Sequence, residues 1–303
     1  MEDTHGTSNA SEAGDFGSTI DVEETSSFTM APIGDQLVQP GSRTYTFTIV
    51  NGGNFADTFT ISHSSANGWN SSSSARNVEV AYAASGTFDI VMDVPHVAAG
   101  TVDSWSVDVT AGNDDTQTDS DSGTTTVAVV SEHTVTIAYA ASNADPGVTV
   151  TYYFVITNTG NEDESFAYSY GSVSDSTATL GMGESETVAA SHTIGSASAA
   201  GDQFTVTFIS GSESAEATTT TNQIYGVTIS LQSTTDNGGI SPGETFDAVY
   251  TVTNTGNGAD TVTIDFNADW LTGASGTTHN LAGFGGTGTA TATLTAPGDA
   301  ASD

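Results

Sequence analysis

Short runs of alternating apolar and polar residues recur along the chain. The clearest runs end at Asn51, Asn158 and Asn254, and each has apolar residues two, four and six positions before the asparagine. A period of two with one apolar face is the pattern of a half-buried β-strand. The sequence therefore predicts three equivalent strands, with these side chains facing an interior: Tyr45, Phe47, Ile49, Tyr152, Phe154, Ile156, Ala248, Tyr250 and Val252.

A second strand is predicted shortly after each asparagine. It is registered on an acidic residue, Asp57, Glu164 or Asp260, and apolar residues stand two and four positions further on. A shift of one residue would turn all these side chains to the opposite face, so the shared parity of three copies supports the register. The predicted inward residues are Phe59, Ile61, Phe166, Tyr168, Val262 and Ile264.

The two strands of each pair are joined by nearly the same turn, and this repeat sets the architecture. The turns are Asn51-Gly52-Gly53-Asn54, Asn158-Thr159-Gly160-Asn161 and Asn254-Thr255-Gly256-Asn257, about 100 residues apart. Glycine and asparagine suit tight turns because both tolerate positive φ. About 100 residues is the size of a small β-sandwich, and no segment has a helical period. We therefore predict an all-β chain of tandem Ig-like antiparallel β-sandwiches with about seven strands each.

The landmarks predict four regions. Residues 1–24 are a polar, flexible lead-in, and the sandwiches are expected at 25–131, 132–223 and 224–303. After Gly201 the second repeat has room for two further strands, whereas the chain stops soon after Gly298 in the third. The third sandwich is therefore expected to be truncated at its C-terminus, which suggests a piece of a longer protein.

The charge balance narrows the function. The chain has 303 residues with 37 acidic and only 2 basic side chains, a formal net charge of −35. Nucleic-acid binding and docking on anionic lipid both require clustered Lys and Arg, so we expect neither. Self-repulsion among like charges destabilises a compact state, and salt screens it. These features favour a halophilic or marine source and a fold that is stabilised by salt.

Several common features are missing from the sequence. There is no cysteine, and therefore no disulfide. No run of about 18 apolar residues predicts a membrane span, and the first residues do not resemble a signal peptide. No nucleophile elbow or phosphate-binding loop occurs, so we expect no enzyme. The interpretation is a segment of an exported protein, located outside the cell, whose export signal and anchor are not in this segment.

Part of the first repeat carries a family resemblance. The stretch from Thr46 to Thr110 contains the Asn51–Asp57 turn, then Asn67-Gly68-Trp69, and then Phe88 through Pro95. It resembles the Ig-like accessory domain associated with bacterial alpha-galactosidases and the related CARDB-type (cell-adhesion-related) domains. The resemblance implies a spacer or adhesive module on an exported bacterial or archaeal protein, and it implies no catalytic residues.

Two tryptophans suggest a possible ligand site. Trp69 and Trp270 occupy corresponding places in the first and third repeats, and the second repeat has none there. Exposed aromatic rings can stack on sugars, which would make the chain a carbohydrate-binding or accessory module of a secreted glycoside hydrolase. The alternative is that both rings cap the hydrophobic core.

The acidic run between two late strands of the first repeat is a candidate calcium loop. Asp114, Asp115, Asp119 and Asp121 could supply some of the six to eight oxygens that Ca²⁺ requires, although the spacing does not fit an EF-hand. The alternative is a solvated acidic hairpin. Calcium could also bind at sandwich junctions, where the candidates are Glu132 with Asp163, and Asp236 with Asp260.

Two short motifs fit an exported protein. Asn9 and Asn70 are in N-glycosylation acceptor sequons. The six histidines are scattered without zinc-ligand spacing.

The sequence as a whole predicts a structural or adhesive spacer of a large cell-surface protein, such as an adhesin, stalk or surface-layer component. Its expected partners are other surface proteins or glycans, and it requires no cofactor other than the candidate calcium.

Overall fold

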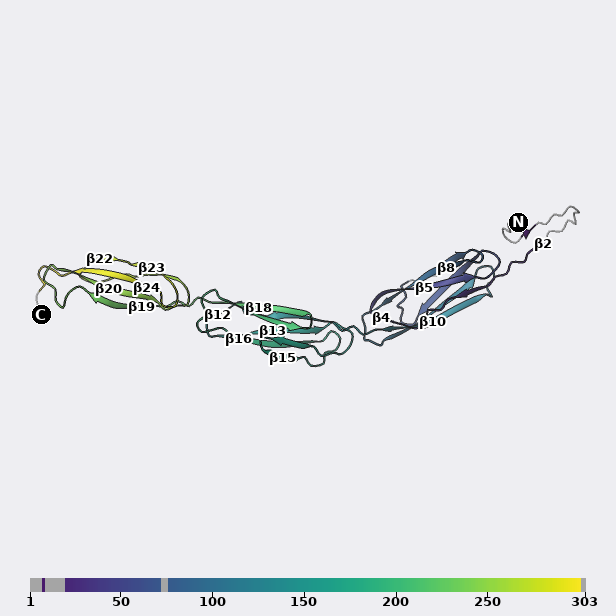
Figure 1. The fold of residues 1–303 in the computed structure, drawn as a ribbon, viewed down its shortest axis with the longest axis horizontal. Coiled ribbons are helices and arrows are strands. Elements are labelled where there is room, and N and C mark those ends of the chain that lie inside the picture. The colour runs from purple at the N-terminus through teal and green to yellow at the C-terminus, as the bar shows by residue number, and fades with distance from the viewer. Residues whose placement is uncertain (1–6, 9–19, 72–75, 301–303) are drawn as a thin grey trace. The chain divides into compact units, whose positions relative to one another are not determined.

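The protein is an all-β molecule. The computed structural model describes residues 7–8, 20–71 and 76–300, and within them all regular structure is β-strand (Figure 1). The predicted fold class, a series of antiparallel β-sandwiches, is confirmed. None of the described residues forms a helix long and apolar enough to cross a membrane.

The chain divides into two compact units. The first comprises Met1–His133, Asn158–Glu164 and Thr179–Glu184, and the second comprises Thr134–Thr157, Ser165–Ala178 and Ser185–Asp303. The turn of the second repeat therefore belongs to the same unit as the first sandwich, and the turn of the third repeat belongs to the unit that contains most of the second sandwich.

The first sandwich consists of two sheets in the first unit. One has three strands in the order β3-β5-β8, and the other has five in the order β4-β10-β9-β6-β7. All pairs are antiparallel except β4 with β10, which is parallel. The strands are β3 (Phe28–Met30), β4 (Gln36–Val38), β5 (Gly41–Asn51), β6 (Asp57–Ser65), β7 (Arg76–Val80), β8 (Ser85–Val94), β9 (Val102–Ala111) and β10 (Thr118–Val127).

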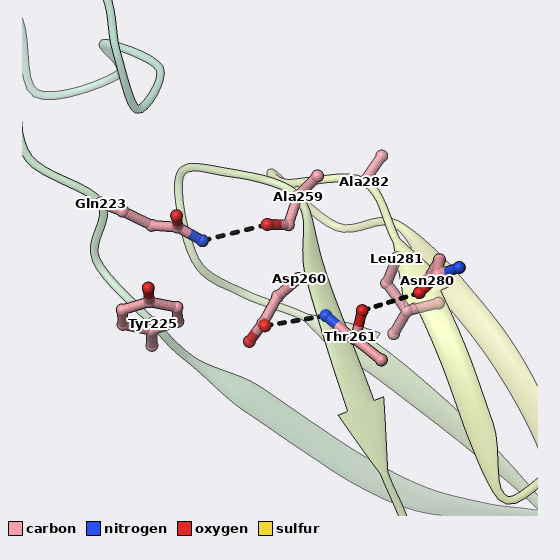
Figure 2. Close-up of a pocket in the computed structure, with 8 residues that line it drawn as sticks. All are labelled: Gln223, Tyr225, Ala259, Asp260, Thr261, Asn280, Leu281 and Ala282. Carbon is pink, nitrogen blue, oxygen red and sulfur yellow. Dashed lines mark hydrogen bonds between the residues drawn. The ribbon is translucent and has the colours of Figure 1, made fainter.

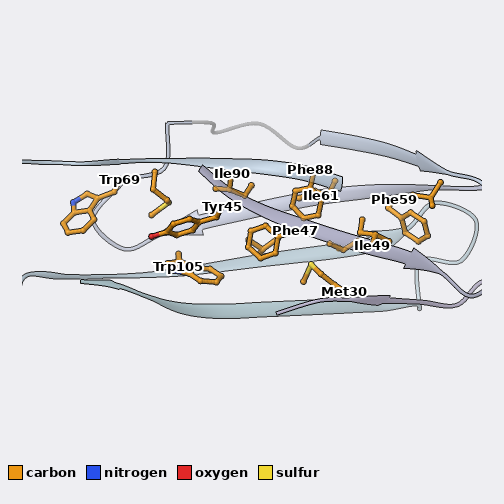
Figure 3. Close-up of a cluster of buried hydrophobic side chains, with 14 of the residues drawn as sticks. Met30, Tyr45, Phe47, Ile49, Phe59, Ile61, Trp69, Phe88, Ile90 and Trp105 are labelled. Atoms are coloured by element: carbon orange, nitrogen blue, oxygen red, sulfur yellow. The ribbon is translucent and has the colours of Figure 1, made fainter. Parts of the chain in front are cut away.

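Alternate side chains of these strands form the core between the sheets. Phe47, Phe59 and Ile61 are at most 1% exposed, as the predicted register requires. Figure 3 shows Phe47 and Ile49 from β5 in the same interior as Trp105 from β9. The ring of Phe47 stacks on that of Phe88, with centroids 5.2 Å apart. Burial of large apolar side chains, roughly 1.5–3 kcal/mol each, is the main stabilising contribution.

The second sandwich repeats this arrangement. Its sheets are β11-β13-β16 and β12-β18-β17-β14-β15, and β12 again pairs in parallel with the last strand, β18. The strands are β11 (His133–Tyr139), β12 (Asn143–Ala144), β13 (Thr149–Asn158), β14 (Ala167–Tyr170), β15 (Val173–Ser176), β16 (Ser185–Thr193), β17 (Gln203–Ser210) and β18 (Glu213–Thr221).

One polar contact inside the core is common to both sandwiches. The Tyr45 hydroxyl is hydrogen bonded to the Thr125 hydroxyl at 2.7 Å, and Tyr152 is bonded to Thr219 at 2.8 Å. The first bond joins β5 to β10, and the second joins β13 to β18, so each bond connects the two sheets of its sandwich. Burial raises the pKa of Tyr45 above its usual value, because the phenolate would lose its hydration.

The third sandwich has fewer strands. Its sheets are β19-β20-β24-β22 and β21-β23. Within the described residues it has no counterparts of the hairpins β9–β10 and β17–β18. The strands are β19 (Val227–Thr234), β20 (Thr245–Asn254), β21 (Asp260–Thr263), β22 (Leu271–Ser275), β23 (Thr278–Leu281) and β24 (Thr287–Thr295).

Two details differ from the sequence prediction. The first two sandwiches have eight strands each, because the opening strand is split into two pieces that pair with different sheets. Tyr250, Val262 and Ile264 are only half-buried, whereas their counterparts in the first repeat are buried. Within the predicted lead-in, the described residues form a short antiparallel pair, β1 (Thr7–Ser8) with β2 (Ile20–Asp21).

Candidate functional site: the repeated turns

The first asparagine of each turn ties the turn to its own sandwich. The Asn51 side-chain amide donates to the carbonyls of Phe55 and Val80 at 2.9 and 3.0 Å, and its oxygen accepts the N–H of Gly53 at 2.9 Å. Asn158 and Asn254 make the corresponding bonds, and all three asparagines are at most 2% exposed. A buried amide with all these partners fixes the turn because each lost bond would leave an unpaired buried group.

The second asparagine of the turn has a different role, which is clearest at Asn161 in the first unit. Its amide donates to the Ala128 carbonyl at 2.9 Å, and its side-chain oxygen accepts the Val130 N–H at 2.7 Å. Its backbone carbonyl accepts the Ala99 N–H at 2.9 Å. Ala99, Ala128 and Val130 belong to the end of the first sandwich and the segment that leaves it. Asn161 is therefore a clamp between one repeat's turn and the preceding sandwich.

Asn257 makes the same clamp in the second unit. Its amide donates to the Asn222 carbonyl at 2.9 Å, its side-chain oxygen accepts the Ile224 N–H at 2.7 Å, and its carbonyl accepts the Ala200 N–H at 3.1 Å. Asn161 and Asn257 are 1% and 6% exposed. The two clamps thus use the same atoms of the same turn position, and both are buried.

Asn54 makes only the two side-chain bonds of the clamp. Its amide donates to the Glu23 carbonyl at 2.9 Å, and its side-chain oxygen accepts the Thr25 N–H at 2.8 Å. These partners lie in the segment that enters the first sandwich, and Asn54 itself is exposed. Asn54 is therefore a natural control for Asn161 and Asn257.

Glycine precedes the clamp asparagine in every copy for a steric reason. A Cβ on Gly53, Gly160 or Gly256 would lie against the backbone carbonyl of Thr25, Val130 or Ile224, respectively. Those carbonyls belong to the segment that enters each sandwich, which must pass close to the turn to reach the clamp asparagine. Only glycine permits this approach.

The acid that follows each turn differs in its surroundings. Asp57 accepts the Ser26 hydroxyl at 3.0 Å, and Glu164 accepts the Ser131 hydroxyl at 2.6 Å. In the third repeat the corresponding linker position is Tyr225, which is 68% exposed. The side chains of Tyr225, Asp260 and Asn280 surround a hollow of about 630 Å³ (Figure 2).

The four aspartates of the predicted calcium loop do not form one site. Asp119 accepts the Met30 N–H and Asp121 accepts the Ile33 N–H, both at 2.8 Å. Asp114 accepts the Thr116 N–H and hydroxyl instead, and these bonds hold its pKa below the usual value. These three carboxylates stabilise the backbone, and Asp115 lies in the turn of the same hairpin.

The described part of the chain contains no group of three or more His, Asp or Glu side chains that could hold a metal ion. The junction pairs, Glu132 with Asp163 and Asp236 with Asp260, stay a prediction. The backbone carbonyl of Glu132 accepts N–H groups of the second turn, Thr159 at 2.9 Å and Gly160 at 2.8 Å.

The two tryptophans have different environments. Trp69 is 7% exposed and belongs to the core of the first sandwich (Figure 3). Its ring is therefore not available as a stacking platform, and the core-cap interpretation applies to it. Trp270 is 40% exposed and lies just before β22.

Of the two predicted glycosylation sites, Asn9 is outside the described residues. Asn70 is half-buried, and its amide nitrogen is 2.7 Å from His63 Nδ1. Burial, assisted by the charge of Arg76, lowers the pKa of His63. A neutral His63 ring can accept this bond, so the Asn70 nitrogen that a glycan would use is already engaged.

Sequence reasoning did not identify the clamp residues, although a signal for them was present. Local conformation was expected to account for both asparagines of each turn, whereas the second one bonds the segment that precedes its sandwich. A polar residue retained without a local partner indicates a contact with another part of the fold.

Comparisons with known proteins do not assign a family. No protein-family model and no curated protein matches the chain. Among solved structures, red sea bream transglutaminase aligns at 10% identity and TM-score 0.27, over 66% of this chain and 31% of that one.

Two other solved structures give similar values. The secreted serine protease VesC of Vibrio cholerae aligns at 10% identity and TM-score 0.23, over 55% of this chain and 44% of its own. A structure titled as a chaperone–tip adhesin complex in CFA/I fimbriae biogenesis aligns at 11% identity and TM-score 0.25, over 63% of this chain and 98% of that one. The chain spans less than half the length of the first two proteins.

Proposed function

We propose that this chain is a spacer segment of a large exported cell-surface protein and that it acts by its length and stiffness. The observation that carries the proposal is the repeated clamp, in which Asn161 and Asn257 make the same three kinds of bond to the preceding sandwich. Tandem domains are expected to move relative to one another unless contacts at their junctions restrain them. Two buried clamps of the same design provide such restraint.

The charge of the chain supports the same role. A net charge of −35 keeps like-charged modules apart and soluble. The resemblance to CARDB-type and alpha-galactosidase-associated domains also fits a spacer or adhesive module outside the cell. The proposal assigns no catalytic step to this chain.

The proposal is tested by measuring distance distributions across each junction. The chain has no cysteine, so pairs of spin labels can be placed at exposed strand positions, Thr87 with Ser174 and Ser174 with Thr289. Asn161→Ala is expected to broaden the first distribution and leave the second unchanged. Asn257→Ala is expected to do the reverse.

Asn54→Ala is the matched control, because this residue makes only the local bonds. It should broaden neither distribution. The spacer proposal would be contradicted if Asn161→Ala and Asn257→Ala left both widths unchanged, or if the wild-type distributions were already as broad as those of the variants.

The alternative, a carbohydrate-binding accessory module, retains one specific observation. Trp270 is exposed, and Tyr225 stands beside the Asp260 carboxylate at a hollow of ligand size. A glycan array separates the two functions. Glycan binding that is lost in either Trp270→Ala or Tyr225→Ala would favour the accessory module, whereas binding to no glycan would favour the spacer.

A further inference from the structure

Asparagine followed by glycine is a chemically labile pair, and the chain contains four such pairs. The backbone nitrogen of the glycine can attack the side-chain carbonyl carbon of the asparagine, because no Cβ on the glycine obstructs the approach. The reaction requires that neither the side-chain amide nor the backbone of the pair is held in place. The pairs are Asn51-Gly52, Asn67-Gly68, Asn237-Gly238 and Asn257-Gly258.

The two pairs in the repeated turns are locked by hydrogen bonds. The side-chain amides of Asn51 and Asn257 each donate to at least two backbone carbonyls. Their exposed fractions are 2% and 6%. The attacking nitrogen of Gly52 is engaged as well, because its N–H donates to the Ser27 carbonyl at 2.9 Å. Reaction at either pair would first have to break several buried bonds.

The pair Asn67-Gly68 lies at the surface but is also held in place. The Asn67 amide donates to the Val102 carbonyl at 2.9 Å, and the Asn67 N–H donates to the Asp103 carboxylate at 2.7 Å. The Gly68 N–H donates to the Ser65 carbonyl at 3.3 Å. Asp103 is 0% exposed, so this loop is anchored in the first sandwich.

Asn237-Gly238 has none of these restraints. The pair lies in the loop between β19 and β20, where its residues have positive φ values of 48° and 85°. The Gly239 N–H donates to the Asp236 carbonyl at 3.0 Å, which closes a β-turn around the pair. Among the described residues, the Asn237 side chain and the Gly238 N–H have no hydrogen-bond partner, and Asn237 is exposed.

We propose that Asn237 is a self-modification site, where the chain converts its own asparagine to aspartyl and isoaspartyl residues through a cyclic imide formed with Gly238. One backbone bond closes this turn, so it opens at a lower cost than the loops around the other three pairs. The opened turn lets the Gly238 nitrogen reach the Asn237 side chain. The proposal does not depend on the spacer function.

The reaction needs only water. The Gly238 nitrogen gives its proton to water and forms a bond to Cγ of Asn237, while the bond from Cγ to Nδ2 breaks and that nitrogen takes up a proton and leaves as ammonia. Water then adds to one carbonyl of the imide and breaks the bond from that carbonyl to the Gly238 nitrogen. Addition at Cγ gives an aspartyl residue, and addition at the main-chain carbonyl gives an isoaspartyl residue, whose backbone runs through the side chain. One water is consumed and one ammonia is released, with no oxidant or reductant.

The products change an exposed loop and leave the sandwich intact. Each product adds a carboxylate next to Asp236, in a chain with a net charge of −35. At the base of the loop, the Thr235 N–H donates to the Asp247 carbonyl at 3.0 Å, and the Thr235 hydroxyl accepts the Asp247 N–H at 2.8 Å. These bonds close the end of the β19–β20 ladder, so the structural effect of the modification should stop there.

The test is to incubate the whole protein in mildly alkaline buffer made with oxygen-labelled water, digest it with pepsin at low pH, and follow the four pairs by mass spectrometry. Label in the new carboxylate distinguishes conversion during incubation from conversion during digestion. We expect Asn237 to convert at least tenfold faster than Asn51, Asn67 or Asn257. In urea, which removes the protection given by the fold, the four pairs should convert at similar rates.

Two glycine variants separate the imide chemistry from the general mobility of the loop. Gly238→Ala places a Cβ on the attacking residue and should slow conversion at least tenfold. Gly239→Ala, at the next position, leaves the attacking residue unchanged and should leave the rate unchanged. A Cβ at either position meets no other atom, so neither change should unfold the protein; circular dichroism would check this.

Three results would overturn the proposal. The first is no conversion at Asn237 in the folded protein over a time in which the urea-unfolded chain converts. The second is conversion of Asn67 in the folded protein as fast as that of Asn237. The third is equal slowing by Gly238→Ala and Gly239→Ala, because the rate would then follow the mobility of the loop and not the access of the attacking nitrogen.

Discussion

The first and third sandwiches use the same repeat but differ in how far it buries its side chains. Ile61 is fully buried in the first, whereas Ile264, at the corresponding position of the third, is half-buried. Asp57 is 3% exposed, and its counterpart Asp260 is half-exposed. The sequence pattern is similar, so the pattern alone does not determine burial. In the first sandwich burial also depends on the hairpin β9–β10, because β10 bonds β3 and β9 pairs with β6.

The largest expected effect compares two isoleucines. Ile61→Ala should destabilise the first sandwich by about 2–5 kcal/mol, because it leaves a cavity in a closed core. Ile264→Ala should cost about 1 kcal/mol, since a half-buried side chain loses less burial. Denaturant-dependent hydrogen exchange of β5 and β20 would measure both. Equal losses of unfolding free energy would contradict the conclusion that the first core is more fully buried than the third.

The turn asparagines should behave alike in the two sandwiches. Asn51→Ala and Asn254→Ala each remove bonds to two backbone carbonyls and one N–H. We expect a loss of about 1–3 kcal/mol in each case, because buried partners are left unpaired. The same hydrogen-exchange measurement applies. A much smaller loss for Asn254→Ala would mean that these bonds stabilise the third turn less than the first.

Salt should stabilise the third sandwich more than the first. Arg43 and Arg76 are the only basic residues of the chain, and both lie in the first sandwich. Acidic self-repulsion in the third is therefore relieved only by screening, which shortens the Debye length to about 3 Å at 1 M. Calorimetry at 0.05 and 1 M salt should show a rise of several degrees in Tm, which corresponds to about 1 kcal/mol in the free energy of unfolding. The rise should be larger for the third sandwich. A flat or falling Tm would contradict the salt dependence.

The smallest expected effect is a pH dependence of the first sandwich. Burial lowers the pKa of His63 in the folded protein below its ordinary value of about 6.5. The unfolded chain therefore binds more protons as the pH falls through about 6.5, and stability is lost in that range. At higher pH the ring is neutral in both states, and the effect is absent. His63→Gln should flatten this part of the stability curve in urea titrations, while an unchanged curve would assign the dependence to other groups.

The sequence was informative wherever one copy could be checked against another. The register of β5, β13 and β20 follows from alternation in three copies, and residues such as Phe47 and Phe154 are buried as predicted. The turns were also identified, but the expected reason was wrong. None of the turn residues has a positive φ, and Gly53, Gly160 and Gly256 are required by the close approach of a backbone carbonyl.

The sequence was less informative about contacts between distant segments. Asp119 and Asp121 resembled cation ligands by number and spacing, but their direction depends on β3 and the segment that follows it, almost 90 residues away in the chain. The clamp of Asn161 likewise requires carbonyls of the preceding sandwich. Alternation specifies a face for each residue, and it does not specify what covers that face.

The most direct test of the account is hydrogen exchange of β6 and β21 in the intact protein. In β6 both edges are paired, so its amides should exchange only on unfolding of the sandwich. In β21 the amides directed away from β23 have no strand partner among the described residues and should exchange much faster, while those bonded to β23 are protected. Equal protection of the two strands would contradict an open third sandwich.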